Sequence, residues 1–479
     1  MEPFLFGFSV THAAKVSRGG DEISAFYLRP DPHMRELLGL ERELLLVYAA
    51  FPQLQARTVE LHDYVVNSNR VRLDPLGSII VSDASNTRAF IRSFLMSESD
   101  RPPIVALRTE ELTRIDTLEA LQRVFLEQFF QRDLFGLESP INKDSVYFGR
   151  GELTTELFDR VRNGQNSGLF GLRRMGKTSV LFAVARRLVA ANEGVFTYIF
   201  LQDPSRYKLR WRDLLQAIVR ETAAHLSPET LETSKIFGLH RSYSEELAAE
   251  RFRNDMKALL AVAPGGRIVL GLDELESISF ELSPADHWNG DFLPFWQALR
   301  SLHQETEGRF VFLVSGINPQ PLERHQVGRF DNPLFETARL YYLPPFEAKD
   351  IETMIGTLAR FMGLDIETLV YQELIQEFGG HPFLTRKACS VAVAHVQRPG
   401  KLSAKYYIQQ RPKIDLEIDR TVTQILSVLG TWYPDEYELI RRLAQGDTGD
   451  FLKVASRDCC KSEAVSRRGV SILSGHLDG

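Results

Sequence analysis

The chain is poor in cysteine, with only Cys389, Cys459 and Cys460 among its 479 residues. Their spacing fits neither a disulfide framework nor a metal-ligand motif, and it is typical of a protein kept in a reducing compartment. No apolar run approaches the roughly 18 residues of a membrane span. The first residues also lack the basic start and the cleavage site of a secretory signal. We therefore expect a cytoplasmic protein with no membrane partner.

A basic excess is missing as well. The formal net charge is −6 and the pI is near 6.1, which disfavours obligate nucleic-acid binding. The Asn-Lys-x-Asp string that reads guanine is absent, so a nucleotide site in this chain would favour adenine. An apolar content of 44% and a charged content of 25% are ordinary for globular protein, and the length suggests roughly three domains.

The strongest motif is the loop from Gly171 to Thr178, which reads Gly-Leu-Arg-Arg-Met-Gly-Lys-Thr between an apolar strand pattern and an apolar helical pattern. It matches the P-loop, Gly-x-x-x-x-Gly-Lys-Ser/Thr. In such a loop the backbone N–H groups surround phosphate oxygens, Lys177 reaches the β- and γ-phosphates, and Thr178 offers its hydroxyl to Mg²⁺. The residues expected to bind nucleotide here are Gly171, Arg174, Gly176, Lys177, Thr178 and Ser179. For Arg174 a solvated loop tip is an equal alternative.

A second motif is the apolar strand that starts near Arg267 and ends in acidic residues. This is the Walker B arrangement, in which Asp273 would hold Mg²⁺ and Glu274 would orient and deprotonate the attacking water. With Lys177, Glu274 is the expected catalytic residue, and Thr178 and Asp273 are the expected metal ligands. Glu276 is a weaker third candidate, because a third acid could simply face solvent.

The segment from Phe148 to Glu152, just ahead of the P-loop, carries Gly149 and Arg150. Together with the two Walker motifs it resembles STAND-type and related AAA+-like P-loop ATPases, including the origin-recognition branch. The resemblance covers about residues 145 to 395. It implies ATP and Mg²⁺ as cofactors, and it implies that Gly149 and Arg150 lie against adenine and ribose. It also implies that the strand at 194–201 lies beside the P-loop strand.

The same resemblance implies a first sensor of the γ-phosphate at the end of the strand that follows Walker B. Ser315 and Asn318 are the candidates, and a turn-forming Ser-Gly-x-Asn-Pro string is an equal alternative. One of Arg324, Arg329 and Arg339 could serve as an arginine finger toward a neighbouring subunit.

Helical apolar spacing from residue 347 to residue 395 predicts a helical bundle, which the resemblance identifies with the nucleotide lid. Its turn Gly380-His381-Pro382 is implied to contact nucleotide. The alternative is a helix stop followed by a helix that opens with proline. Arg386, one turn further on, is a candidate second sensor.

Three apolar runs, at 44–48, 78–82 and 103–107, predict buried strands of a largely parallel sheet in the first 140 residues. Asp83 and Arg108 follow two of these strands, where α/β sheets place ligand sites, although solvated charges explain them as well. Near the other end, 425–443 has a helical pattern broken at Tyr433-Pro434 and fits the start of a winged-helix-like unit.

These patterns predict an α/β protein: a P-loop NTPase core with a parallel sheet, a helical lid, a small N-terminal α/β domain and a partial winged-helix-like C-terminus. The expected domains are an N-terminal domain of unknown function at 1–140, the ATPase core at 141–345, the lid at 346–420 and the winged-helix-like part at 421–479.

The resemblance implies a signalling switch that binds ATP, hydrolyses it slowly to ADP and self-associates on ATP binding, in response to an unknown protein or nucleic-acid trigger. A role in bacterial stress or anti-phage responses is one possibility for such a switch. The alternative function is a DNA-associated helper ATPase of the origin-recognition or transposition type. A complete winged helix and a basic face would favour that alternative.

Overall fold

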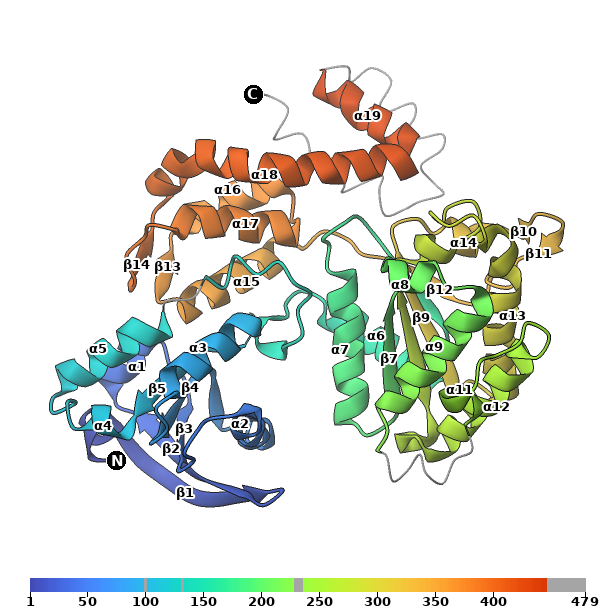
Figure 1. The fold of residues 1–479 in the computed structure, drawn as a ribbon. Helices are drawn as coiled ribbons and strands as arrows, with labels where there is room; N and C mark the ends of the chain where they lie inside the picture. The colour runs from blue at the N-terminus through green and yellow to red at the C-terminus, as the bar shows by residue number, and fades with distance from the viewer. Residues whose placement is uncertain (99–100, 131–132, 228–235, 446–479) are drawn as a thin grey trace. The chain divides into compact units, whose positions relative to one another are not determined.

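The computed structural model describes residues 1–98, 101–130, 133–227 and 236–445 (Figure 1). The chain forms two compact units, which are described separately below. Unit 1 consists of Met1–Ser139, Lys143–Phe148 and Phe346–Arg420, and unit 2 of Pro140–Asn142, Gly149–Pro345 and Thr421–Gly479. None of the helices within the described ranges is long and apolar enough to cross a membrane. The four domains expected from the sequence stay a prediction.

Unit 1 contains a five-stranded sheet with the order β1-β2-β3-β4-β5 (Figure 1). The strands are β1 (Phe8–Arg18), β2 (Asp21–Pro30), β3 (Glu43–Ala49), β4 (Leu73–Ser82) and β5 (Ile104–Arg108). The three predicted apolar runs fall in β3, β4 and β5, which pair in parallel. The prediction of a largely parallel sheet is wrong for the other half, because β1 pairs with β2 and β2 with β3 in antiparallel register.

The antiparallel half begins with a hairpin around Gly19 and Gly20. Their φ angles of 60° and 87° lie in the left-handed region that favours glycine, and Arg18 pairs with Asp21 across them. A Gly-Gly pair between two extended runs is a hairpin signal. Most side chains of β1 are at least partly exposed, so the strand lacks the continuous apolar run that identified its neighbours.

Helices follow the strands of this sheet along the chain. They are α1 (Pro32–Leu38), α2 (Ala56–Ser68), α3 (Thr87–Ser97), α4 (Thr109–Leu112) and α5 (Leu118–Phe129). From α2, Val59, Leu61 and Val65 enter a core with the inward residues of β2, β3, β4 and β5. On the same helix, His62 Nε2 lies 2.7 Å from Ser78 Oγ of β4.

The helical bundle predicted from residue 347 onward is confirmed and belongs to unit 1. It contains α15 (Ala348–Phe361), α16 (Thr368–Phe378), α17 (Pro382–Val393) and the first part of α18 (Ala404–Trp432), with β13 (Leu364–Ile366) and β14 (Gly400–Leu402) paired in parallel. Arg386 of α17 is buried and donates to the Leu134 carbonyl at 2.9 Å. Burial lowers the pKa of this guanidinium to about 10.

Unit 2 contains a second five-stranded sheet, in which every pairing is parallel. Its order is β12-β6-β9-β8-β7, from β6 (Ser167–Phe170), β7 (Val195–Phe200), β8 (Ile268–Asp273), β9 (Phe310–Gly316) and β12 (Arg339–Tyr342). The expectation that the 194–201 strand lies beside the P-loop strand is wrong. That strand, β7, pairs with β8 at the sheet edge, and β9 and β12 flank β6.

Helices cover both faces of this sheet (Figure 1). In chain order they are α6 (Gly151–Arg162), α7 (Lys177–Ala190), α8 (Pro204–Tyr207), α9 (Trp211–Ala224), α11 (Phe237–His240), α12 (Ala248–Val262), α13 (Trp288–Glu305) and α14 (Gln320–Glu323). Large aromatic side chains of α13, including Phe292 and Trp296, are at most 1% exposed and join the core with residues of α9, α12, β8 and β9. The carboxyl ends of β6, β8 and β9 are therefore held on a rigid scaffold.

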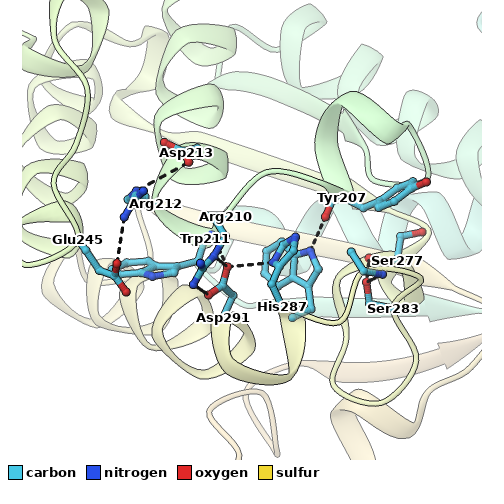
Figure 2. Close-up of polar contacts among 12 residues, drawn as sticks. Tyr207, Arg210, Trp211, Arg212, Asp213, Glu245, Ser277, Ser283, His287 and Asp291 are labelled. Atoms are coloured by element: carbon cyan, nitrogen blue, oxygen red, sulfur yellow. Dashed lines mark hydrogen bonds and ion pairs between the residues drawn. The ribbon is translucent and has the colours of Figure 1, made fainter.

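A buried carboxylate ties the start of α9 to the start of α13 (Figure 2). Asp291 accepts two hydrogen bonds from the Arg210 guanidinium, at 2.6 and 2.7 Å, and one from the Trp211 backbone N–H at 3.0 Å. His287 Nδ1 lies 3.0 Å from the same carboxylate, and Trp288 Nε1 donates to the Tyr207 carbonyl at 2.6 Å. These contacts fix the chain that follows β7 against the chain that follows β8.

The last described helices of unit 2 are the end of α18 and α19 (Pro434–Ala444), and the predicted break at Tyr433-Pro434 is confirmed. Leu429 and Ile440 form a small apolar cluster, against which Leu172 of the P-loop and Tyr433 pack. The winged-helix-like assignment stays a prediction, because the rest of that segment, 446–479, lies outside the described residues.

Candidate nucleotide-binding site

The P-loop connects the end of β6 to the start of α7, as the sequence predicts. Gly176 is the N-cap of α7 and has a φ of 96°, so a glycine is needed at this position. At the other end of the loop, a Cβ on Gly171 would lie 3.1 Å from the Leu343 Cβ. Arg174 is exposed and has a φ of 60°, which places it at the outer bend of the loop.

Lys177 is only 6% exposed, and its side chain turns back over the loop. Its Nζ donates to the carbonyls of Gly171, at 3.0 Å, and of Leu172, at 3.2 Å. The ammonium group therefore lies over the concave side of the loop, next to the backbone that would surround a phosphate. Phosphate oxygens carry negative charge, whereas the carbonyl oxygens are neutral. A bound phosphate would therefore accept stronger hydrogen bonds from the Lys177 ammonium group than the carbonyls do.

Asp273 lies at the end of β8 and accepts hydrogen bonds from three hydroxyl groups. Its Oδ2 accepts from Thr178 Oγ1 at 2.6 Å and from Tyr198 OH at 2.9 Å, and its Oδ1 accepts from Ser315 Oγ. Ser315 is directly opposite Asp273 in the β8–β9 register. The structure thus brings together the two expected metal ligands, Thr178 and Asp273, and the sensor candidate Ser315.

Tyr198 was not anticipated from the sequence. Burial and the neighbouring Asp273 carboxylate raise the pKa of its hydroxyl, so it stays a hydrogen-bond donor at neutral pH. The signal available in the sequence was weak, a single tyrosine two residues before the end of a strand. Its relevance appears only once β7 is known to pair with β8.

Glu274 follows Asp273 in the left-handed conformation, with a φ of 62°. Its backbone N–H donates to Asp273 Oδ1 at 3.1 Å. Burial raises the pKa of the Glu274 carboxyl; Asp273 adds to the rise, and Lys177 and Arg173 oppose it. A raised pKa moves a carboxylate toward the range in which it can accept a proton from water.

Glu276, the weaker third acid, is 7% exposed and does not face solvent. Its Oε1 accepts from the backbone N–H groups of Ile317 and Asn318, just after β9, and a Cβ on Gly316 would lie 2.7 Å from the same oxygen. Burial raises the pKa of this carboxyl to about 7. Glu276 therefore holds the chain that follows β9.

The C-terminal helices contact the same short segment. Tyr433, between α18 and α19, donates its hydroxyl to the Ile317 carbonyl at 2.6 Å. Ile317 thus bonds to Glu276 through its N–H and to Tyr433 through its C=O. Neither Tyr433 nor this use of Glu276 could be recognised from the sequence, because both depend on where the chain after β9 runs.

Several predicted residues have other partners in the described chain. The Ser179 hydroxyl accepts from the Ile141 N–H at 3.0 Å, and Arg150 donates to the Pro344 carbonyl at 2.5 Å. Asn318 Oδ1 accepts from the Gln320 N–H at 2.9 Å, in agreement with its turn-forming alternative. Gly149 has a φ of 66° and precedes Arg150, the N-cap of α6.

Two finger candidates form surface ion pairs, Arg324 with Glu281 and Arg339 with Glu156, and Arg329 is exposed. These contacts select none of the three as an arginine finger.

The Gly380-His381-Pro382 turn belongs to unit 1, where it joins α16 to α17. Gly380 has a φ of 81°, and a Cβ there would lie 2.1 Å from the Phe346 carbonyl oxygen. His381 is the N-cap of α17, with Pro382 at its first turn. The turn thus has the geometry of the helix-stop alternative, and its contact with nucleotide stays a prediction.

The chemistry of these groups fits a nucleotide with Mg²⁺. Thr178, Asp273 and Ser315 supply hydroxyl and carboxylate oxygens, the ligand type that Mg²⁺ prefers, and Lys177 supplies a buried cation for phosphate. In the part of the chain that the structure describes, no group of three or more His, Cys, Asp or Glu side chains could hold a metal by itself. Mg²⁺ bound with a nucleotide does not need one, because phosphate and water complete its coordination.

Solved structures with a similar fold are distant in sequence. A Walker-type ATPase of Pyrococcus abyssi is 16% identical, with coverage of 72% of this chain and 100% of that protein and a TM-score of 0.48. The ORC2 protein of Aeropyrum pernix, in ADPNP–ADP complexes, is 15% identical over 69% and 84% of the two chains, with a TM-score of 0.43.

A comparison with curated proteins found no match. The family model described as "Novel STAND NTPase 1" matches residues 136–402, which is more than half of the chain. This range includes the P-loop, the strand β8 that ends in Asp273, the strand β9 and the helices α15 to α17. The chain therefore belongs to the novel STAND NTPase 1 family, with the α/β fold of a P-loop NTPase.

Proposed function

We propose that unit 2 binds ATP with Mg²⁺, hydrolyses it slowly and acts as a signalling switch. The observation that carries this proposal is the 2.6 Å hydrogen bond between Thr178 and Asp273, residues 95 positions apart in the chain. It joins the first residues of α7 to the end of β8, with Lys177 beside them. Family membership supports nucleotide binding independently.

In the nucleotide complex, Lys177 would exchange its two carbonyl partners for phosphate oxygens. Thr178 and Asp273, now bonded to each other, would hold Mg²⁺ between them. Ser315 already contacts Asp273, so its hydroxyl would lie close to the metal and the γ-phosphate. The N-terminus of α7 adds its positive end to the same phosphate site.

Glu274 is the residue that we assign to hydrolysis. Its raised pKa suits a group that accepts a proton from the attacking water, and it follows directly on Asp273, which would hold the metal.

A switch also needs a contact that responds to the nucleotide. The chain just after β9 supplies one, because Ile317 lies two residues beyond Ser315 and bonds to Tyr433. A movement of the β9 end upon loss of the γ-phosphate would therefore alter the packing of α18 and α19. Leu172 gives the P-loop a second, direct contact with these helices.

The test separates binding from turnover with Glu274→Gln. We expect this variant to bind ATP with Mg²⁺ as the wild type does, to release phosphate at least about 100-fold more slowly, and to assemble when ATP is added. Glu246→Gln, at an exposed position of the same unit, is the matched control and should hydrolyse normally.

Normal phosphate release by Glu274→Gln would overturn the catalytic assignment, and an unchanged size with and without ATP would overturn the assembly. ATP-dependent, salt-sensitive binding to duplex DNA would favour the helper ATPase instead.

A further inference from the structure

A serine, a histidine and an aspartate form a hydrogen-bonded line in unit 1, far in sequence from the nucleotide site. His62 Nε2 lies 2.7 Å from Ser78 Oγ, and His62 Nδ1 lies 3.0 Å from Asp63 Oδ1. His62 and Asp63 are adjacent on α2, and Ser78 lies on β4. Ser78 and His62 are each 4% exposed.

The charges around this line fix the direction of its hydrogen bonds. Arg101 donates hydrogen bonds from both terminal nitrogens to the Asp63 carboxylate, and the one from Nη2 to Oδ2 is 2.5 Å long. Burial alone would raise the pKa of Asp63, but the bonds from His62 and Arg101 outweigh it and hold this pKa well below its ordinary value. An ionised carboxylate can only accept, so neutral His62 carries its hydrogen on Nδ1. Its Nε2 is then the acceptor for the Ser78 hydroxyl.

This arrangement meets the geometric requirement for an activated serine. A nucleophile needs a base within hydrogen-bond reach, and the base needs a third group that fixes its tautomer. Ser82, on the same strand, instead donates to the Ala49 carbonyl at 2.7 Å. A purely structural buried Ser–His bond would satisfy the distances equally well, so a place for a substrate is also required.

A cavity of about 350 Å³ supplies that place, because Ser78, His62 and Asp63 all line it. One part of its remaining wall is apolar, from Leu45, Val66, Leu73, Pro75, Pro102 and Ile104, and the acidic Asp74 and Asp144 belong to the polar part. The basic side chains of Arg70 and Lys143 also line it. A cavity of this size accommodates a small molecule with an apolar acyl group.

We propose that this cavity is a second catalytic site, in which Ser78 acts as the nucleophile and His62 as the base on small carboxylic esters with apolar acyl groups. The Ser78 oxygen bonds to the ester carbonyl carbon as its proton passes to His62 Nε2. The bond from that carbon to the alcohol oxygen then breaks, and His62 returns the proton to the departing alcohol. Water, deprotonated by His62, then bonds to the acyl carbon. The bond from this carbon to Ser78 Oγ breaks, the proton passes from His62 to Ser78 Oγ, and the acyl group leaves as a carboxylic acid. Asp63 and Arg101 are positioning residues, since they act through His62.

The experiment treats the full-length chain with a fluorophosphonate probe and maps the adduct by peptide mass spectrometry. We expect one adduct on Ser78. His62→Gln should slow labelling at least about 100-fold, because the general base is lost. Ser82→Ala is the matched control and should label at the wild-type rate. Hydrolysis of p-nitrophenyl butyrate should likewise be lost in Ser78→Ala and retained in Ser82→Ala.

The mapping on the wild-type chain decides the proposal even if Ser78→Ala fails to fold. Absence of an adduct on Ser78 in the folded protein, or equal labelling of Ser78 in wild type and in His62→Gln, would overturn it. A Ser78→Ala variant that hydrolyses the ester at the wild-type rate would overturn it as well.

Discussion

Replacement of Glu276 by glutamine should make unit 2 more stable at alkaline pH. The Glu276 carboxyl is buried beneath the chain after β9, where one oxygen accepts two backbone hydrogen bonds. The other oxygen, Oε2, is also buried and accepts no hydrogen bond in the described chain. Ionisation therefore places a charge where only one oxygen is solvated by hydrogen bonds. Glutamine has the same shape as the protonated acid and cannot ionise.

The size of the effect follows from the pKa. Burial raises it from the ordinary 4.5 to about 7, so between these values the folded protein holds a proton that the unfolded chain has lost. The stabilisation from this group is complete below about pH 4.5 and is lost as the pH rises through 7. At about 1.4 kcal/mol per pH unit, the full difference is about 3 kcal/mol. The Gln variant should thus match the wild type near pH 5 and exceed it by up to about 3 kcal/mol at pH 8.

Tryptophan fluorescence during urea unfolding measures this difference within the full-length chain. The four tryptophans, Trp211, Trp288, Trp296 and Trp432, all belong to unit 2, so the signal reports that unit. The measurements should be made without nucleotide and with a chelator, because a bound metal would add its own charge. Glu246→Gln, at an exposed position, should leave the pH profile unchanged. Parallel profiles for wild type and Glu276→Gln would refute the assignment of a raised pKa to Glu276.

Two further variants test the contacts around the β9 end. Tyr433→Phe removes the hydroxyl that bonds to the Ile317 carbonyl and should lower the unfolding free energy of unit 2 by about 1 kcal/mol. Tyr437→Phe, in the same apolar cluster, is the control and should lower it by less. Equal losses in the two variants would argue against the hydrogen bond. Gly316→Ala places a Cβ about 2.7 Å from Glu276 Oε1 and should cost about 1–3 kcal/mol by the same assay. Gly290→Ala, with open space around it, is the matched control, and an equal response of both glycine variants would contradict the close approach.

The arrangement of the candidate nucleotide site was largely predictable because its parts have strong local patterns. The P-loop is fixed by glycine and lysine spacing, and Asp273 ends a fully buried strand. Both motifs lie at the carboxyl ends of parallel strands, and these ends lie on the same side of a sheet, so the two motifs were expected to be close together. Ser315 follows by the same reasoning and indeed contacts Asp273.

The remaining features depend on strand order and long-range packing. β7 lies at the sheet edge because β9 inserts between β6 and β8, which no single strand's pattern encodes. Glu276 and Tyr433 gain their partners only from the course of the chain after β9. In unit 1 the Gly19-Gly20 pair indicates a hairpin in the sequence. The strand β1 before it is largely exposed, so it has no continuous apolar run that would identify it as a strand. The His62–Ser78 pair joins a helix to a strand and has no sequence motif.

The most direct test of the central assignment is a calorimetric titration of ATP with Mg²⁺ into the wild type, Lys177→Ala and Lys208→Ala. Lys208 is an exposed lysine of the same unit and controls for the loss of one positive charge. We predict saturable binding to the wild type and to Lys208→Ala, and a loss on the order of 100-fold or more in Lys177→Ala, because the charged hydrogen bonds to phosphate disappear. Equal affinity of all three proteins for ATP would contradict the placement of the nucleotide at this loop.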